Sequence, residues 1–300
     1  MVEFTYERIM SSSKAEPSWQ KVKKKALKTK VLQDNIIRVM SFNIHLKDCE
    51  EKQPEECSWK RRKEFVASMI RFHHMDLIGL QEPTKDQLND LMHFLPEYDW
   101  HGVSLDDGIE EGSIDAILFL KNRFEVLESS HFYLSSTPEV SSRGWKAKFI
   151  RGVTWSKLKD LKTNQIFYFF NTHFDYHSIL ARNKSAQLLR EQVEQISQNY
   201  PFIVTGDFNL FPKMGGEETY KILTRDNFLI DAQFKAVFPH HGPTGSWSGF
   251  KEAGQPGIKP DYIFVNKKIN VMSHGILADT FDGKFPSDHM PVVSEIEIFN

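Results

Sequence analysis

The sequence predicts an α/β protein in which two mixed, mainly antiparallel β-sheets pack face to face with helices outside them. From about residue 36 onward, short apolar runs that end in polar residues recur along the chain. Several of these runs follow one another with no helical pattern between them. This order favours antiparallel pairing over the strand–helix alternation of a doubly wound parallel sheet. The hydrophobic content of 40%, which includes 24 Phe, is ample for a large core.

The first half of the chain predicts strands separated by helices and then four strands in a row. Alternating β-favouring residues or continuous apolar runs indicate strands, and helical spacing of apolar residues, as in Phe65, Met69 and Phe72, indicates helices. The expected elements are strand 36–42, helix 59–73, strand 76–80, helix 86–94, strands 114–120 and 124–134, and strands 151–158 and 165–172. Each of the last two pairs is expected to be antiparallel, the first joined around 121–123 and the second as a hairpin.

The second half predicts two further helices, a long loop and the last strands. The stretch 240–260 is rich in Gly, Pro and Ser and too long for a tight turn, so we expect a loop that covers part of the body. The other expected elements are helix 179–199 (with Leu180, Leu188, Leu189, Val193 and Ile196 on one side), strand 202–205, helix 217–223, and strands 262–265, 269–274 and 291–298. No repeat or linker divides the chain, which predicts a basic N-terminal arm over 1–35 and one catalytic domain over 36–300.

Charge is unevenly distributed between these two parts. The chain has a net charge of −2, of which residues 1–35 contribute +4 and the remainder −6. A solvated arm is the plainest interpretation of its lysines, and contact with a polyanion or an acidic partner is the alternative. No stretch resembles a membrane span or a secretory signal, so we expect a cytoplasmic protein unless a signal was removed or export is non-classical. In that compartment Cys49 and Cys57 are expected as free thiols, with a disulfide as the alternative.

Polar residues with oxygen or imidazole side chains accompany the apolar runs. Each lies at or just past one end of such a run: Asn43, Glu82, His173, Asp175, Asp207, Asn209, Asp261, Asp288 and His289. Sheet packing brings such ends to one edge, although Asp175 fits a loop or helix cap equally well. Hard oxygen ligands without cysteine select Mg²⁺, Mn²⁺ or Ca²⁺ over zinc. The histidines suit phosphate contact and proton transfer, because imidazole titrates near neutral pH.

Six short segments give these residues a family context. They are MSFN (40–43), IGLQE (78–82), NTH (171–173), TGDFN (205–209), DYIF (261–264) and SDH (287–289). In these segments and in their order, the chain resembles the endonuclease/exonuclease/phosphatase superfamily, which is also called DNase I-like. The resemblance implies a four-layer α/β-sandwich and Mg²⁺-dependent hydrolysis of a phosphoester, with Mn²⁺ or Ca²⁺ as alternative ions.

The resemblance also implies roles for residues on the metal side of the site. Glu82 matches the principal metal ligand, with Asn43 beside it and Asp288 as an additional carboxylate. Asp207 matches the residue that orients or deprotonates the attacking water, and Asn209 matches a phosphate contact.

On the other side, His289 matches the catalytic histidine, with Asp261 as its orienting partner, and His173 matches the second histidine. Whether Asp207 or His289 takes the proton from water stays open. Arg182 and Trp247 are predicted substrate contacts; a surface ion pair for Arg182 and loop packing for Trp247 are the alternatives.

The substrate is the least determined feature. We favour a small or flexible phosphodiester or phosphomonoester, hydrolysed by a monomer. A DNase- or RNase-type nuclease, a sphingomyelinase- or phosphoinositide-type lipid phosphoesterase and a catalytically silent binding module are the alternatives, so nucleic acid and peripheral membrane contact both stay open as partners. The acidic body argues against a duplex nuclease. The strip WKAKF (145–149) mixes basic and aromatic residues as single-strand binders do, and a solvated strand edge explains it equally well.

Overall fold

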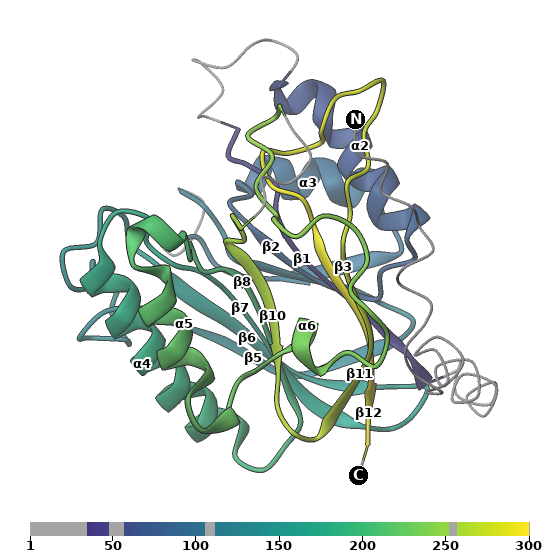
Figure 1. Ribbon diagram of the computed structural model, residues 1–300. Helices are drawn as coiled ribbons and strands as arrows, with labels where there is room; N and C mark the ends of the chain where they lie inside the picture. The colour runs from purple at the N-terminus through teal and green to yellow at the C-terminus, as the bar shows by residue number, and fades with distance from the viewer. Residues whose placement is uncertain (1–34, 48–56, 106–111, 252–256, 300) are drawn as a thin grey trace, which may run out of the picture. The chain divides into compact units, whose positions relative to one another are not determined.

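The computed structural model describes residues 35–47, 57–105, 112–251 and 257–299 (Figure 1). The predicted basic arm lies outside these residues except for Asn35, and Cys49 lies outside them as well. The arm, the domain boundary beside it and the state of the cysteines therefore stay predictions. Among the described helices, none is long and apolar enough to cross a membrane.

Two six-stranded sheets form the body of the domain (Figure 1). The first has the order β11 (Ile269–Ile276), β12 (Val292–Ile298), β1 (Ile37–Asn43), β2 (Leu77–Gln81), β4 (Ala116–Leu120) and β3 (Tyr98–His101). The second has the order β5 (Phe124–Tyr133), β6 (Gly152–Asp160), β7 (Ile166–His173), β8 (Phe202–Asp207), β10 (Asp261–Val265) and β9 (Ile230–Asp231). Among the strands that the structure describes, only β1 with β2 and β7 with β8 pair in parallel.

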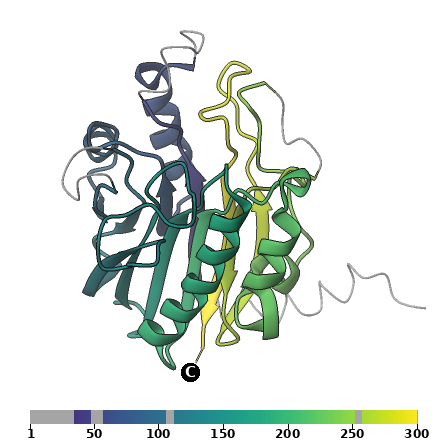
Figure 2. The ribbon, with the colours of Figure 1, turned by 90° about the vertical axis from the view of Figure 1, so that its left-hand side faces the viewer.

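Helices cover the outer face of each sheet. Helices α2 (Trp59–Phe72) and α3 (Lys85–Phe94) pack on the first sheet, and α4 (Ile179–Ser197) and α5 (Gly216–Thr224) lie side by side on the second (Figure 2). Short helical turns complete the fold: η5 (Pro212–Met214), η6 (Arg225–Asn227) and α6 (Ala232–Lys235). The four layers confirm the predicted α/β-sandwich.

Central strands of both sheets are buried on both faces. In β7, Phe167 and Phe169 face the layer between the sheets, and Phe170 faces the helices. This alternation follows from the two-residue period of a strand, and each buried Phe contributes roughly 2–3 kcal/mol. The continuous apolar run predicted at this strand is confirmed, as is the antiparallel pairing of β6 with β7.

The two sheets approach each other closely at Gly79 of β2. A Cβ atom at this position would lie 2.1 Å from Thr205 Oγ1 and 2.4 Å from Asn171 Oδ1, so only glycine fits. The Asn171 side chain crosses from β7 to the first sheet and donates to the carbonyls of Leu80 (2.7 Å) and Ala116 (2.9 Å). This buried polar link fixes the two sheets against each other just below the edge that carries the predicted site.

The predicted antiparallel pairing of residues 114–120 with 124–134 is wrong. Strand β4 belongs to the first sheet and β5 to the second, so the chain crosses between the sheets here. Buried Arg123 holds the crossing with ion pairs to Asp76 (2.8 Å), just before β2, and to Asp160 (3.4 Å), at the end of β6. A three-residue connection does not reveal in the sequence that it changes sheets, because a hairpin needs no more.

Two predicted apolar stripes are partly wrong. In α2, Met69 is buried as predicted, but Phe72 is 74% exposed, and Arg62 and Val66 share the buried face. In α4, Leu189 is buried as predicted, but Leu180 is 48% exposed. Each misplaced residue lies at a helix end, where the covering sheet no longer reaches it. Strands β3 and β9 and helix α6 are too short to give a periodic signal and were not predicted.

Candidate active site

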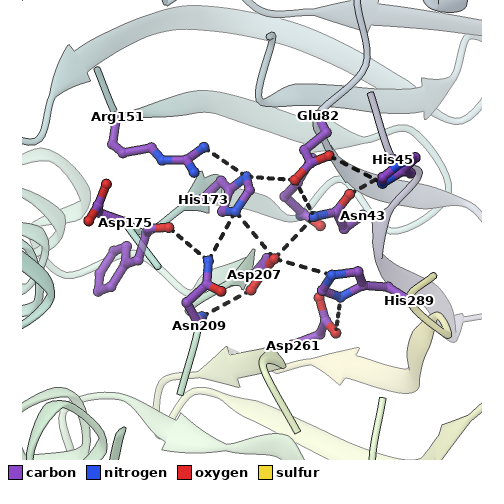
Figure 3. A network of polar contacts seen from close by, with 12 residues as sticks. Asn43, His45, Glu82, Arg151, His173, Asp175, Asp207, Asn209, Asp261 and His289 are labelled. Carbon is purple, nitrogen blue, oxygen red and sulfur yellow. Dashed lines mark hydrogen bonds and ion pairs between the residues drawn. The ribbon is translucent and has the colours of Figure 1, made fainter. Parts of the chain in front are cut away.

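Most of the predicted site residues lie together in one network of polar contacts (Figure 3). Asn43, His173 and Asp207 are the last residues of β1, β7 and β8, and Glu82 directly follows β2. Because β1 pairs in parallel with β2 and β7 with β8, the two strand ends in each sheet lie at the same edge of that sheet. The antiparallel strands β10 and β12 begin at this edge, which adds Asp261, Asp288 and His289 to it.

Asp261 and Asp207 flank the buried imidazole of His289. Its Nδ1 lies 2.8 Å from Asp261 Oδ2, and its Nε2 lies 3.7 Å from Asp207 Oδ2. Ser246 donates to the same Asp261 oxygen at 2.6 Å and so fixes that carboxylate. Burial lowers the pKa of His289, but the charges of Asp261 and Asp207 outweigh it and raise the pKa well above its ordinary value. His289 is therefore an imidazolium at neutral pH.

Asp207 Oδ2 is the point at which the site contacts converge (Figure 3). It accepts from Asn43 Nδ2 at 3.0 Å and lies 3.3 Å from His173 Nε2, while Oδ1 accepts from the Asn209 amide at 2.9 Å. Burial raises the pKa of Asp207 to about 6, against the opposing charge of His289. At neutral pH the group is therefore ionised but more basic than an ordinary aspartate.

The second histidine has a cationic partner. Arg151 Nη1 lies 3.0 Å from His173 Nδ1, and a guanidinium only donates, so Nδ1 accepts and the proton of neutral His173 is on Nε2. Burial, and then the charges of Arg151 and His289, lower the pKa of His173 well below its ordinary value. His173 is therefore neutral, with Nε2–H directed at Asp207. Asn209 Nδ2, 3.1 Å from this nitrogen, donates to the carbonyl of Phe174 at 2.9 Å.

Three residues of the site have a left-handed backbone conformation. The φ angles are 63° at His45, 70° at Glu82 and 52° at Asn209. Non-glycine residues rarely adopt this conformation and do so where surrounding contacts over-determine it. At Glu82 such contacts are direct, because its carboxylate accepts from Asn43 Nδ2 (3.1 Å) and from the Leu46 amide (3.0 Å).

His45 is a site residue that the sequence analysis did not identify. Its Nδ1 lies 3.3 Å from Asp288 Oδ2 and 3.9 Å from Glu82 Oε2, between the two carboxylates predicted to bind metal. Although burial opposes it, Asp288 and Glu82 raise the pKa of His45. Burial likewise opposes the lowered pKa of Asp288, which comes from the His45 hydrogen bond and the charge of His289. In the sequence, only its position two residues after Asn43 could have indicated that His45 belongs to the site.

The donor set fits a divalent cation beside Glu82. Glu82 and Asp288 offer carboxylate oxygens, which Mg²⁺ and Mn²⁺ prefer, and Asn43 has an amide oxygen that here accepts from the His45 amide at 3.0 Å. Asp207, Asp261 and His289 also offer ligand atoms that lie within 4.8 Å of one another. That second group suits a metal less well, because Asp261 occupies Nδ1 of His289 and the ring is cationic.

One buried acid near His173 was also missed. Asp115 precedes β4 and is 1% exposed, and burial raises its pKa to about 8 against the opposing charge of Arg151. The charges of Asp207 and Glu82 add to the increase. Asp115 is therefore largely protonated at neutral pH, which limits the excess of negative charge at this edge.

The structure does not bring Arg182 to the cluster, which corrects the prediction that it contacts substrate. Its side chain is fully buried and donates to the backbone carbonyls of Asp175 (3.0 Å), Tyr176 (2.8 Å) and Met214. The guanidinium is thus occupied in holding two loops together. Trp247 does lie at the site, with its ring edge-on to His289 at a centroid distance of 4.8 Å, and its contact with substrate stays a prediction.

Two mixed sheets with a carboxylate, amide and imidazole cluster at their common edge define a DNase I-like protein. Comparison with known proteins gives the particular family: the chain belongs to the Endonuclease/Exonuclease/phosphatase family, whose sequence model matches residues 40–289. The resemblance predicted from the six segments is confirmed. Members of this family hydrolyse phosphoester bonds and include phosphatases and nucleases.

Solved structures of the family are similar to this chain over most of its length. A family protein from Bacteroides vulgatus is 34% identical, with a TM-score of 0.81, over 88% of this chain and 99% of that one. A mannosyl-6-phosphatase from Bacteroides thetaiotaomicron is 31% identical, with a TM-score of 0.81, over 88% and 100%. An uncharacterized mimivirus protein is 24% identical over 276 residues, which are 81% of this chain but only 38% of the viral protein.

Proposed function

We propose that this protein is a divalent-metal-dependent phosphoesterase in which water attacks the phosphorus of a small phosphoester. The observation that carries the proposal is the position of Asp207 Oδ2. This single oxygen accepts from Asn43 Nδ2 at 3.0 Å and lies 3.3 Å from His173 Nε2 and 3.7 Å from His289 Nε2. A carboxylate with donors on three sides fits the point at which a water and a phosphate oxygen meet.

Glu82, with Asn43 and Asp288, would hold the ion, with Mg²⁺ as the first candidate and Mn²⁺ or Ca²⁺ as alternatives. When bound there, the ion supplies charge neutralisation on the phosphate and on the leaving oxygen. The hydrogen bond from Asn43 Nδ2 to Glu82 Oε1 orients the Glu82 carboxylate for this task.

Both pKa values are raised, which leaves Asp207 a carboxylate and His289 an imidazolium at neutral pH and divides proton transfer between them. Asp207, with a pKa of about 6, is ionised at neutral pH and accepts the proton of the attacking water. His289, whose pKa is raised by Asp261 and Asp207, stays protonated and donates from Nε2 to a non-bridging phosphate oxygen as this oxygen gains charge. His173 and Asn209 contribute neutral donors, and the bond between phosphorus and the leaving oxygen breaks.

A substrate panel tests the proposal. It contains bis-p-nitrophenyl phosphate, p-nitrophenyl phosphate, mannose 6-phosphate, single- and double-stranded DNA, RNA, sphingomyelin and inositol phosphates, each assayed with Mg²⁺, with Mn²⁺ and with EDTA. We expect at least one substrate to be hydrolysed, with turnover abolished by EDTA and by His289→Ala. Binding of Mn²⁺ is measured separately by the rise in melting temperature. Binding of metal without any turnover would leave a silent binding module as the better account.

A sugar-phosphate monoesterase is the second candidate. The similarity to a mannosyl-6-phosphatase, at 31% identity over 88% of the chain, favours it. Turnover of mannose 6-phosphate above all diesters in the panel would establish this candidate. The same panel tests the nuclease and the lipid phosphoesterase, each of which has its own substrates there.

A further inference from the structure

An exposed cluster of two aromatic rings and one lysine lies beside the site; we call Lys148, Phe149 and Tyr176 the aromatic rim. Phe149 is 45% and Tyr176 36% exposed, and their ring centroids are 6.1 Å apart. The Lys148 ammonium lies 5.4 Å from the first centroid and 5.3 Å from the second, and it donates to Tyr176 Oη at 2.6 Å. The rim therefore offers ring surface and positive charge together.

Arg151 connects the aromatic rim to the proposed phosphate site. Its guanidinium carbon lies 5.4 Å from the Phe149 ring centroid, while Nη1 contacts His173 Nδ1 at 3.0 Å. Phe149 is thus separated from His173 by a single side chain. A substrate whose phosphate reaches His173 has the aromatic rim within reach of the group attached to that phosphate.

The rim is held in place by Asp175. One carboxylate oxygen, Oδ2, accepts from the amides of Lys148 (2.8 Å) and Phe149 (3.4 Å). The other, Oδ1, accepts from the amides of His177 (3.0 Å) and Ser178 (2.8 Å). This buried carboxylate therefore ties the strip that carries Lys148 and Phe149 to the loop that carries Tyr176.

The turn before the rim is strained. Ala147 N donates to the Gly144 carbonyl at 2.8 Å, and both residues between them, Trp145 and Lys146, have positive φ angles of 50° and 65°. Two consecutive non-glycine residues in this conformation are costly, and such strain persists mainly where it serves a binding or catalytic site. Ser178 Oγ holds the turn by donating to the Trp145 carbonyl at 3.2 Å.

We propose that the aromatic rim is a subsite for the nucleobase of a nucleotide, either free or at the end of a single strand. The inference rests on the proposed function, because the phosphate of that nucleotide would occupy the site beside His173. Bases stack on exposed aromatic faces, and an ammonium group beside them pairs with the backbone phosphate. A lipid surface is less well matched, since the Lys148 ammonium lies against both rings and would have to leave water with them.

Binding without turnover tests the subsite. The probe is a fluorescein-labelled eight-residue thymidylate strand in EDTA at low salt, measured by fluorescence anisotropy, with AMP as competitor. We expect Phe149→Ala and Tyr176→Ala each to raise the Kd about tenfold. Lys148→Ala should raise the Kd and reduce its dependence on salt. Competition by AMP indicates that one nucleotide suffices, and strand binding without competition indicates that a chain end is needed.

Two matched variants serve as controls. Phe72→Ala removes a still more exposed ring at the end of α2, and Lys162→Ala removes an exposed lysine in the turn after β6, so both should leave the Kd unchanged. The inference is overturned if wild-type protein does not bind the strand, or if the rim variants bind it like wild type. It is also overturned if Phe149→Ala impairs only anionic vesicle binding or only mannose 6-phosphate turnover. Strand binding that depends on the rim, without any metal-dependent hydrolysis, would refute the proposed function alone.

Discussion

His173 and His289 face the same Asp207 oxygen from opposite sides of the site, yet their charge states are opposite. Both rings are buried, and their Nε2 atoms lie 3.3 Å and 3.7 Å from Asp207 Oδ2. The other ring nitrogen contacts Arg151 in His173 and Asp261 in His289. Burial lowers both pKa values; at His173 the charge of Arg151 lowers the pKa further, whereas at His289 the charges of Asp261 and Asp207 outweigh burial and keep the ring cationic.

This comparison shows how one edge supplies two kinds of donor. The cationic half, His289 with Asp261, can stabilise charge that develops on the phosphate. The neutral half, His173 with Arg151, adds a hydrogen bond without adding a second imidazolium to the site. The two halves can be separated by removing either histidine, by neutralising Asp261, or by removing the charge of Arg151.

Removal of either imidazole should have the largest and most unequal effect. We expect His289→Ala to lower kcat by roughly 10³-fold or more, because a positioned acid–base group contributes 10²- to 10⁴-fold. His173→Ala should lower it by about a hundredfold, since one neutral hydrogen-bond donor is lost. Steady-state kinetics with the best substrate of the panel measures both. Equal losses would contradict the division of roles, and circular dichroism checks that each variant folds.

Loss of the charge on Asp261 should weaken the cationic half. Asp261→Asn removes the carboxylate that favours the imidazolium, so the pKa of His289 falls and kcat drops by about a hundredfold. Activity depends on protonated His289 and is lost as pH rises through its raised pKa. The alkaline limb of the pH–rate profile should therefore move to lower pH in this variant. An unmoved alkaline limb would mean that another group controls it.

Replacement of Arg151 should bring the pKa of His173 closer to that of His289. Arg151→Met keeps the volume but removes the cation beside His173 Nδ1, so the pKa of His173 should rise. It should stay below its ordinary value, because burial is the larger cause. The imidazole NMR signals followed against pH measure the change, and we expect kcat to fall about tenfold. A His173 signal that titrates as in wild type would rule out Arg151 as a cause.

The smallest expected effect concerns stability beside the neutral half. Folded protein keeps a proton on Asp115 up to about pH 8, whereas the unfolded chain releases it near 3.8. Unfolding therefore releases a proton between these values, and the free energy of unfolding falls as pH rises. In wild type the free energy of unfolding should fall between pH 5 and pH 7, and Asp115→Asn should make this fall smaller by about 2 kcal/mol. Urea unfolding at the two pH values measures it. Parallel pH dependence in both proteins would show that Asp115 is not protonated in the fold.

Much of the fold was predictable because it depends on local periodicity. The run in β7 predicted a strand buried on both faces, and the segments TGDFN and SDH fixed the family. The assignment of β4 and β5 to different sheets was not predictable, since the link at Arg123 depends on Asp76 and Asp160, which are remote in the sequence. Arg182 shows the opposite error, because a charged residue in a helix gives no sign that backbone carbonyls will surround it.

The residue pattern alone predicts the candidate site: carboxylates, amides and imidazoles at the ends of apolar strands, in the order of a known family. The tertiary structure alone decided the charge state of each. A pKa depends on burial and on charges within a few ångströms, and these come from strands far apart in the chain. Thus Arg151 and Asp261 distinguish two otherwise similar histidines, and His45 meets Glu82 and Asp288 only after both sheets have formed.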